Sequence, residues 1–152
     1  MLALFQREIA DAVKVPVFMS SLIQVPLVSR MLASDQKVGV VANREALSED
    51  HLKGAGIADE SMVVAGMQDQ PQFAEVILRG ESKDLDLALF DRELSSVVAA
   101  MIEGNPEVGA LVLECTDLSH FAPGLYERFG LLVFDLTSLT RMVAATVDRK
   151  RT

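Results

Sequence analysis

The fold is decided by residues 108–119, which read Val-Gly-Ala-Leu-Val-Leu-Glu-Cys-Thr-Asp-Leu-Ser. The apolar run from Gly109 to Glu114 predicts a buried β-strand, and the single cysteine, Cys115, follows it directly. The residues after the cysteine are of the kind that cap helix N-termini, and they precede a helical pattern over Phe121–Phe129. The stretch is therefore a strand, a polar turn and a helix, with a thiol at the turn.

The position of Cys115 supports two interpretations. Backbone N–H groups and the dipole of a following helix favour negative charge, and such a setting lowers a cysteine pKa from its free value of about 8.5. On this interpretation Cys115 is a reactive thiolate. Free cysteine is also among the most buried residue types, so Cys115 is equally well interpreted as a small core hydrophobe.

Composition excludes several classes of protein. Half of the 152 residues are hydrophobic, as in a globular domain, and the net charge of −8 argues against nucleic acid or an anionic membrane as partner. One cysteine excludes an internal disulfide and is consistent with a reducing cytoplasm. His51 and His120 are isolated in the sequence, so we expect no metal site. No signal peptide or membrane-spanning apolar run is found.

The rest of the chain alternates between strand and helix patterns. Further strands are predicted at Val15–Met19, Val38–Ala42, Ser61–Gly66 and Leu131–Phe134. Helices are predicted at Met1–Val13, Leu22–Leu32, Phe73–Leu78, Leu85–Glu103 and Leu139–Arg149, with a short one after Ser48. This alternation predicts an α/β fold in three layers, with a mostly parallel sheet and helices on both faces.

Small polar side chains follow several of the predicted strands. They are Ser20 and Ser21, Asn43, Cys115 and Thr116, and Thr137 and Ser138. In parallel sheets ligands bind outside the carboxyl ends of the strands, so these groups predict a site along one edge. Each is also explained as a helix cap. Neither glycine-rich phosphate-binding motif is present, and we expect no cofactor.

Several segments resemble the aspartate/glutamate racemase superfamily across essentially the whole chain. The similar segments are Ser20-Ser21-Leu22-Ile23-Gln24-Val25-Pro26, Val38-Gly39-Val40-Val41-Ala42-Asn43, Val64-Ala65-Gly66-Met67, Glu114-Cys115-Thr116-Asp117 and Phe134-Asp135. The resemblance implies a flavodoxin-like lobe in which Cys115 transfers an α-proton without a cofactor. It implies that Thr116 holds the substrate carboxylate, that Asn43 contacts polar groups of the substrate, and that Ser20 and Ser21 contribute from the other side.

The chain departs from that family where its first catalytic cysteine is expected, just before the first helix. We therefore expect a remnant of a first lobe at 1–35, a second lobe at 36–136, and a C-terminal helix at 137–152 that packs on the first lobe. The expected function is an impaired cytoplasmic racemase or epimerase acting on a small carboxylate or amino acid. The alternatives are a one-cysteine decarboxylase, a maleate-isomerase-like enzyme, or a truncated, non-catalytic domain that forms homodimers.

Overall fold

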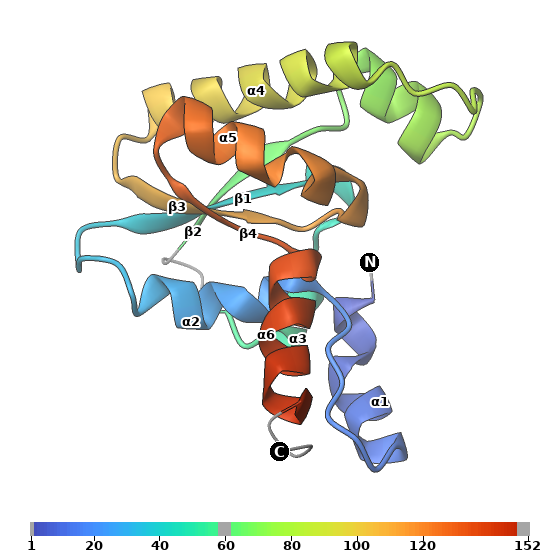
Figure 1. Cartoon of the computed structure of the whole chain (residues 1–152), viewed down its shortest axis with the longest axis vertical. Coiled ribbons are helices and arrows are strands. Elements are labelled where there is room, and N and C mark those ends of the chain that lie inside the picture. Colours follow the sequence, from blue (N-terminus) through green and yellow to red (C-terminus); the bar gives the residue numbers. More distant parts are fainter. Residues whose placement is uncertain (1, 58–61, 149–152) are drawn as a thin grey trace.

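The computed structural model describes residues 2–57 and 62–148, and its centre is a four-stranded, wholly parallel sheet (Figure 1). The strands are β1 (Lys37–Ala42), β2 (Met62–Gly66), β3 (Val108–Leu113) and β4 (Leu132–Phe134), in the order β2-β1-β3-β4. Four predicted strands are confirmed to within one residue at each end. Ser61, the first residue of the predicted strand Ser61–Gly66, lies outside the described residues. The α/β class is therefore confirmed.

Helices precede, connect and follow the strands. In chain order they are η1 (Ala3–Phe5), α1 (Gln6–Ala12), η2 (Ser21–Gln24), α2 (Val25–Ser29), η3 (Arg44–Ala46), α3 (Glu49–Gly54), η4 (Phe73–Leu78), α4 (Leu87–Gly104), η5 (Thr116–Phe121), α5 (Ala122–Phe129) and α6 (Leu136–Asp148). The predicted helices are all present, with bounds shifted by a few residues where the structure describes them. The ends of the first and last predicted helices, at Met1 and Arg149, lie outside the described residues.

The predicted strand at Val15–Met19 is wrong, because this segment is irregular and joins no sheet. Pro16 has no backbone N–H to offer a neighbouring strand. The segment instead pairs with a side chain: Gln6 donates through Nε2 to the Val17 carbonyl at 3.0 Å and accepts from the Met19 N–H at 2.9 Å. Those two bonds give two backbone groups of the segment partners outside any sheet.

Two apolar cores lie on the two faces of the sheet. On one face α4 and α5 cover side chains of β1 and β3, and the fully buried Phe90, Leu94 and Leu125 are at their centre (Figure 1). On the other face η2, α2 and α3 cover the alternate side chains of the same strands, with Leu22 and Val25 fully buried. Because β1 and β3 are buried on both faces, they are continuous apolar runs in the sequence.

The N-terminal segment is fastened to the end of β3 by two serines. Ser21 is 1% exposed and its hydroxyl donates to the Leu113 carbonyl at 2.5 Å. Ser20 caps η2 by accepting from the Leu22 N–H at 3.2 Å, and its hydroxyl also donates to the Glu114 carboxyl at 3.3 Å. These bonds position the segment before β1 against the carboxyl edge of the sheet.

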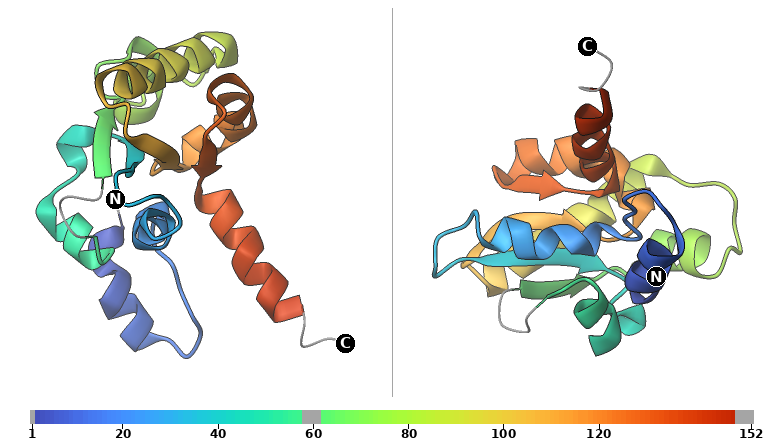
Figure 2. Two further views of the ribbon diagram at one scale, coloured as in Figure 1. Left: turned by 90° about the vertical axis from the view of Figure 1, so that its left-hand side faces the viewer. Right: turned by 90° about the horizontal axis from the view of Figure 1, so that it is seen from below.

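The last helix extends away from this body. Figures 1 and 2 show α6 leaving the carboxyl edge of the sheet, with its C-terminal half apart from the other elements. Met142 and Val147 on this helix are 49% and 58% exposed, and near the N-terminus Leu2 and Phe5 are 54% and 45% exposed. Within the described residues, no helix is both long and apolar enough to cross a membrane.

Replacing Ser21 by Ala removes the hydroxyl that donates to the buried Leu113 carbonyl. We expect a loss of about 1–3 kcal/mol in the free energy of unfolding, the usual cost of leaving a buried polar group without its partner. Urea denaturation measures this loss. Ser34→Ala, in an exposed turn before β1, is the matched control and should change stability by less than about 0.5 kcal/mol. Equal effects of the two variants would contradict the role of Ser21.

Self-association stays a prediction, now centred on the exposed apolar side chains of α6. We expect the chain to sediment as a dimer or larger species, and the double variant Met142→Glu, Val147→Glu to sediment as a monomer, because charge opposes burial of that surface. Sedimentation velocity measures both. A concentration-independent monomer for the unchanged chain would contradict the prediction.

Candidate functional site

The strand order creates one position where a ligand site is expected. The chain passes from β1 outward to β2 and then crosses to β3 on the other side of β1. In open parallel sheets, ligands bind where the strand order reverses in this way, outside the carboxyl ends of the two central strands. Here those ends are followed by Asn43 after β1 and by Glu114 and Cys115 after β3. The sheet therefore places three polar side chains at its switch point.

Cys115 lies directly between β3 and η5 and is half-buried. Its thiol donates to Oδ2 of Asp117, with a sulfur–oxygen distance of 3.3 Å. Burial raises the pKa of the Cys115 thiol to about 12, and the negative charges of Asp117 and Glu114 add to the rise, whereas the backbone N–H of Asp117 opposes it. At neutral pH the free protein therefore holds a neutral thiol.

The predicted lowering of the thiol pKa by the helix dipole is wrong for this structure. The helix after Cys115 is the six-residue 3-10 helix η5. The N–H groups at its start favour the thiolate, but burial and two neighbouring carboxylates have the larger effect on the pKa, because each of them disfavours a negative charge on the sulfur. Sequence reasoning placed the thiol correctly at the turn but did not include the charges beside it.

Glu114 is a site residue that sequence reasoning missed. Its carboxyl is largely buried between the end of β3 and the N-terminal segment, and burial raises its pKa, whereas the hydrogen bond from Ser20 lowers it. The available signal was a carboxylate at the end of an apolar strand, immediately before the cysteine. Ser20 and Ser21, predicted to touch substrate, are buried and bonded to this strand end, and their contact with a substrate stays a prediction.

Asn43 has an unused hydrogen-bonding group. Its Oδ1 atom is buried, and within residues 2–57 and 62–148 it has no hydrogen-bond partner. A buried polar atom without a partner is costly, so such an atom beside a switch point is a candidate contact for a ligand. Asn43 and Cys115 were predicted to lie along the same edge of the sheet, and the parallel pairing of β1 with β3 places the two strand ends that carry them side by side at that edge.

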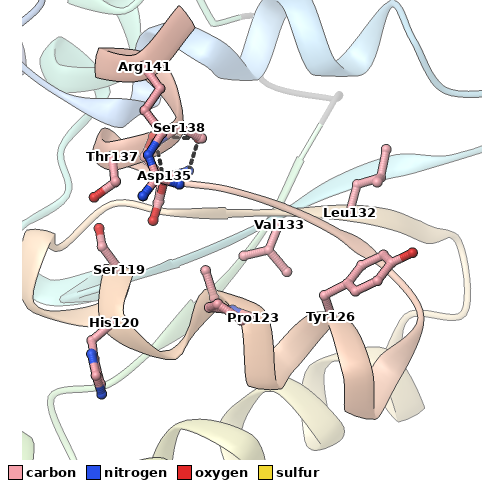
Figure 3. A pocket seen from close by; sticks show the side chains of 11 residues that line it. Ser119, His120, Pro123, Tyr126, Leu132, Val133, Asp135, Thr137, Ser138 and Arg141 are labelled. Carbon is pink, nitrogen blue, oxygen red and sulfur yellow. Dashed lines mark hydrogen bonds between the residues drawn. The ribbon is translucent and has the colours of Figure 1, made fainter.

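Thr116, the residue that follows Cys115, lines a cavity. It is exposed and lines a space of about 380 Å³ together with side chains of η5 and α6. A larger space of about 550 Å³ adjoins it along β4 (Figure 3). Among the described residues no group of three or more His, Cys, Asp or Glu side chains is arranged to hold a metal ion. A reaction without a cofactor stays a prediction.

The chain is similar to parts of several curated proteins. It is 31% identical over 145 residues to dimethylsulfoniopropionate lyase 7 of Emiliania huxleyi (strain CCMP1516), a match covering 90% of this chain and 42% of that protein. It is 31% identical over 156 residues to a dimethylsulfoniopropionate lyase of Durusdinium sp. clade D, covering 97% of this chain and 50% of that protein. The chain thus spans half or less of the length of these relatives. No family model and no solved structure matches it.

These relatives overturn the racemase interpretation. They are named as lyases, so the assignments to the aspartate/glutamate racemase family, to the isomerases and to an impaired racemase are wrong. The segments behind that resemblance are ends of buried strands and starts of helices, several with small polar residues, and parallel α/β sheets produce such segments for reasons of burial and capping alone. The chain is instead similar, over nearly all of its length, to part of several dimethylsulfoniopropionate lyases.

The thiol pKa predicts how Cys115 reacts. We expect slow alkylation by iodoacetamide at pH 7–8 and a steep rise toward pH 12, because only the thiolate reacts. The unfolded chain ionises first, near the ordinary value of 9.0, so folded stability should fall as the pH rises from about 9 toward 12. Alkylation rates followed by mass spectrometry measure the reactivity.

Replacing Asp117 by Asn should lower the thiol pKa, because the substitution removes a negative charge and weakens the acceptor of the S–H bond. Alkylation at pH 9 should therefore be faster, by about tenfold for each pKa unit lost. Asp35→Asn, in the exposed turn before β1, is the matched control and should leave the rate unchanged. An unchanged rate in Asp117→Asn would contradict the electrostatic account.

Proposed function

We propose that this chain carries the proton-transfer site of a lyase that splits a carbon–sulfur bond in a small sulfonium carboxylate such as dimethylsulfoniopropionate. The observation that carries the proposal is the half-buried Cys115 thiol at the switch point of the sheet, bonded to Asp117. The similarity to dimethylsulfoniopropionate lyases supports the choice of substrate class. Those relatives are about twice as long as this chain or longer, so we assign their activity to this chain only as part of the proposal.

The proposed reaction is an elimination that needs one base. The Cys115 thiolate removes a proton from the carbon beside the substrate carboxylate. The electron pair of that C–H bond forms a double bond to the next carbon, and the bond from that carbon to the sulfonium sulfur breaks. Dimethyl sulfide leaves with the C–S electron pair and acrylate remains. The proton taken from the substrate restores the neutral Cys115 thiol, and the proton that left the thiol when the thiolate formed passes to water. No oxidant or reductant is consumed.

The charges around the thiol suit a substrate with a cationic group. Glu114 and Asp117 raise the thiol pKa in the free protein. A sulfonium cation bound beside them offsets their field and so favours the thiolate, since an opposite charge nearby stabilises the ionised form. Asp117 already accepts the S–H hydrogen bond and is the group placed to receive the proton when the thiolate forms. The net charge of −8 also favours the approach of a cation.

Other residues at the edge take supporting roles in the proposal. Asn43 offers its unpartnered Oδ1 and Thr116 its hydroxyl to polar groups of the substrate. Ser20 acts through Glu114, whose carboxyl it holds, and Ser21 fixes the end of β3. A reaction that uses no cofactor and takes place in a reducing, cytoplasmic setting stays part of the proposal.

We also propose that the sheet belongs to the flavodoxin-like group of α/β folds. The order β2-β1-β3-β4 is the first part of the flavodoxin order, with its ligand site between the first and third strands. Within this scheme, residues 1–35 and 137–152 flank a central α/β unit at 36–136. The packing of Leu22 and Val25 on the sheet supports one continuous unit with its N-terminal flank.

The lyase proposal predicts release of dimethyl sulfide by the 152-residue chain. Incubation with dimethylsulfoniopropionate should give equal amounts of dimethyl sulfide, measured by headspace gas chromatography, and acrylate, measured by proton NMR. Cys115→Ser should lower the rate by about 10²–10⁴-fold, the usual contribution of a general base.

Two results would overturn the proposal. One is release of dimethyl sulfide by the unchanged chain no faster than in buffer. The other is full activity in Cys115→Ser. The control Ser34→Ala should retain the rate, because Ser34 lies before β1, at the edge opposite Cys115. Thermal unfolding of each variant confirms that the folded state is compared.

A further inference from the structure

The two cavities beside α6 share one wall. The larger lies along β4, between α5 and α6 (Figure 3). The smaller adjoins it and is lined by Thr116 as well. Both are lined by Ser119, Thr137 and Arg141. Figure 3 shows Arg141 and Thr137 on α6 across from Ser119 on η5. We call these three residues the shared wall. They come from η5 and α6, which α5 and β4 separate in the sequence.

The polar groups of the shared wall are unused within the part of the chain that the structure describes. The Ser119 Oγ atom is buried and has no hydrogen-bond partner there. The Arg141 side chain is exposed, and none of the ion pairs or hydrogen bonds found among the described residues involves it. A buried hydroxyl, an exposed hydroxyl and a guanidinium therefore face one space without a protein acceptor.

The neighbouring polar groups are, in contrast, occupied by one another. Asp135 is 4% exposed and its Oδ1 accepts from the Ser138 N–H at 2.6 Å. The Ser138 hydroxyl in turn accepts from the Asp135 N–H at 2.9 Å. This reciprocal cap begins α6 and fixes the turn that carries Thr137. The one carboxylate in the lining is thus held within the cap, and Arg141 is the exposed charge.

We propose that the shared wall is a subsite for the carboxylate group of a small ligand. A guanidinium presents paired N–H donors that match the two oxygens of a carboxylate, and the hydroxyls of Ser119 and Thr137 supply further donors. Thr137 also lies in the first turn of α6, where the helix dipole favours negative charge. The observations together select a carboxylate over a cation or an apolar group.

The subsite deepens the proposed function, on which its choice of substrate rests. Thr116 lines the smaller cavity and follows Cys115 directly in the chain. A carboxylate on Arg141 would therefore leave the rest of the molecule directed toward the thiol. The sulfonium end then lies toward Glu114 and Asp117, so that the two ends of a zwitterion meet opposite charges. The arrangement makes Arg141 a determinant of substrate specificity.

The test uses propionate, which carries the carboxylate but has no group to eliminate. Titration of the ¹⁵N-labelled chain should shift the amide signals of residues 116–119 and 136–141 in NMR spectra. Arg141→Gln should weaken propionate binding by about 10- to 100-fold, the effect of removing a hydrogen bond to a charged group. Arg141→Lys keeps the positive charge but loses the paired N–H donors, so its affinity for propionate should lie between those of the unchanged chain and of Arg141→Gln.

The controls separate this inference from the proposed lyase reaction. Cys115→Ser should bind propionate within about twofold of the unchanged chain, because the thiol lines neither cavity. Arg30→Gln, at an exposed arginine after α2, should also leave binding unchanged. If the chain releases no dimethyl sulfide but binds propionate through Arg141, the lyase proposal fails and the subsite stands.

Three results would overturn the subsite. The first is no detectable binding at 50 mM propionate, a concentration that half-fills a site with a dissociation constant of roughly 50 mM. The second is propionate binding that Arg141→Gln leaves unchanged. The third is a set of signal shifts confined to residues outside the two cavities. With dimethylsulfoniopropionate, Arg141→Gln should raise KM more than it lowers kcat, since the arginine holds a part of the molecule that does not react.

Discussion

The structure depends on the burial of β1 and β3 side by side in the middle of a parallel sheet. Both strands are covered on both faces, and their hydrogen bonds fix a register in which Val41 lies opposite Leu113. Parallel pairing ends both strands at the same edge, and the crossover from β2 places the reversal of strand order between them. Burial of the apolar strands therefore places Asn43, Glu114 and Cys115 at the same edge of the sheet. These polar residues take their positions from the points at which β1 and β3 end.

At that edge, electrostatics and not backbone geometry decides the state of the thiol. A helix start favours an anion, but η5 is short, the thiol is half-buried, and two carboxylates stand beside it. Burial is the largest contribution and the neighbouring charges act in the same direction. The thiol is therefore neutral at neutral pH, and this property distinguishes it from thiols that are ionised in the free protein.

Sequence patterns predicted most of the framework because the strongest physical signals are local. Runs such as Val38–Ala42 are short, apolar and rich in valine, which favours a buried strand. Gly130, at φ 69°, ends α5 in the left-handed conformation that favours glycine. Val15–Met19 is also apolar, but the side chain of Gln6, which lies outside the segment, bonds to Val17 and Met19, and no strand forms. Of the shared wall, only Thr137 was predicted as a site residue, since Ser119 and Arg141 come together only through the packing of η5 and α6. Short motifs also misled the family assignment, because strand ends with small polar caps are common to many α/β sheets.

The neutral state of Cys115 has a consequence for the chemistry of the free protein in an oxidising environment. Peroxides attack the thiolate form of cysteine, and sulfenic acid formation follows the fraction of thiol that is ionised and accessible. With a pKa near 12 and the sulfur half-buried, that fraction is very small at neutral pH. The same burial and negative charge that raise the thiol pKa therefore also protect the single cysteine from oxidation in the free protein.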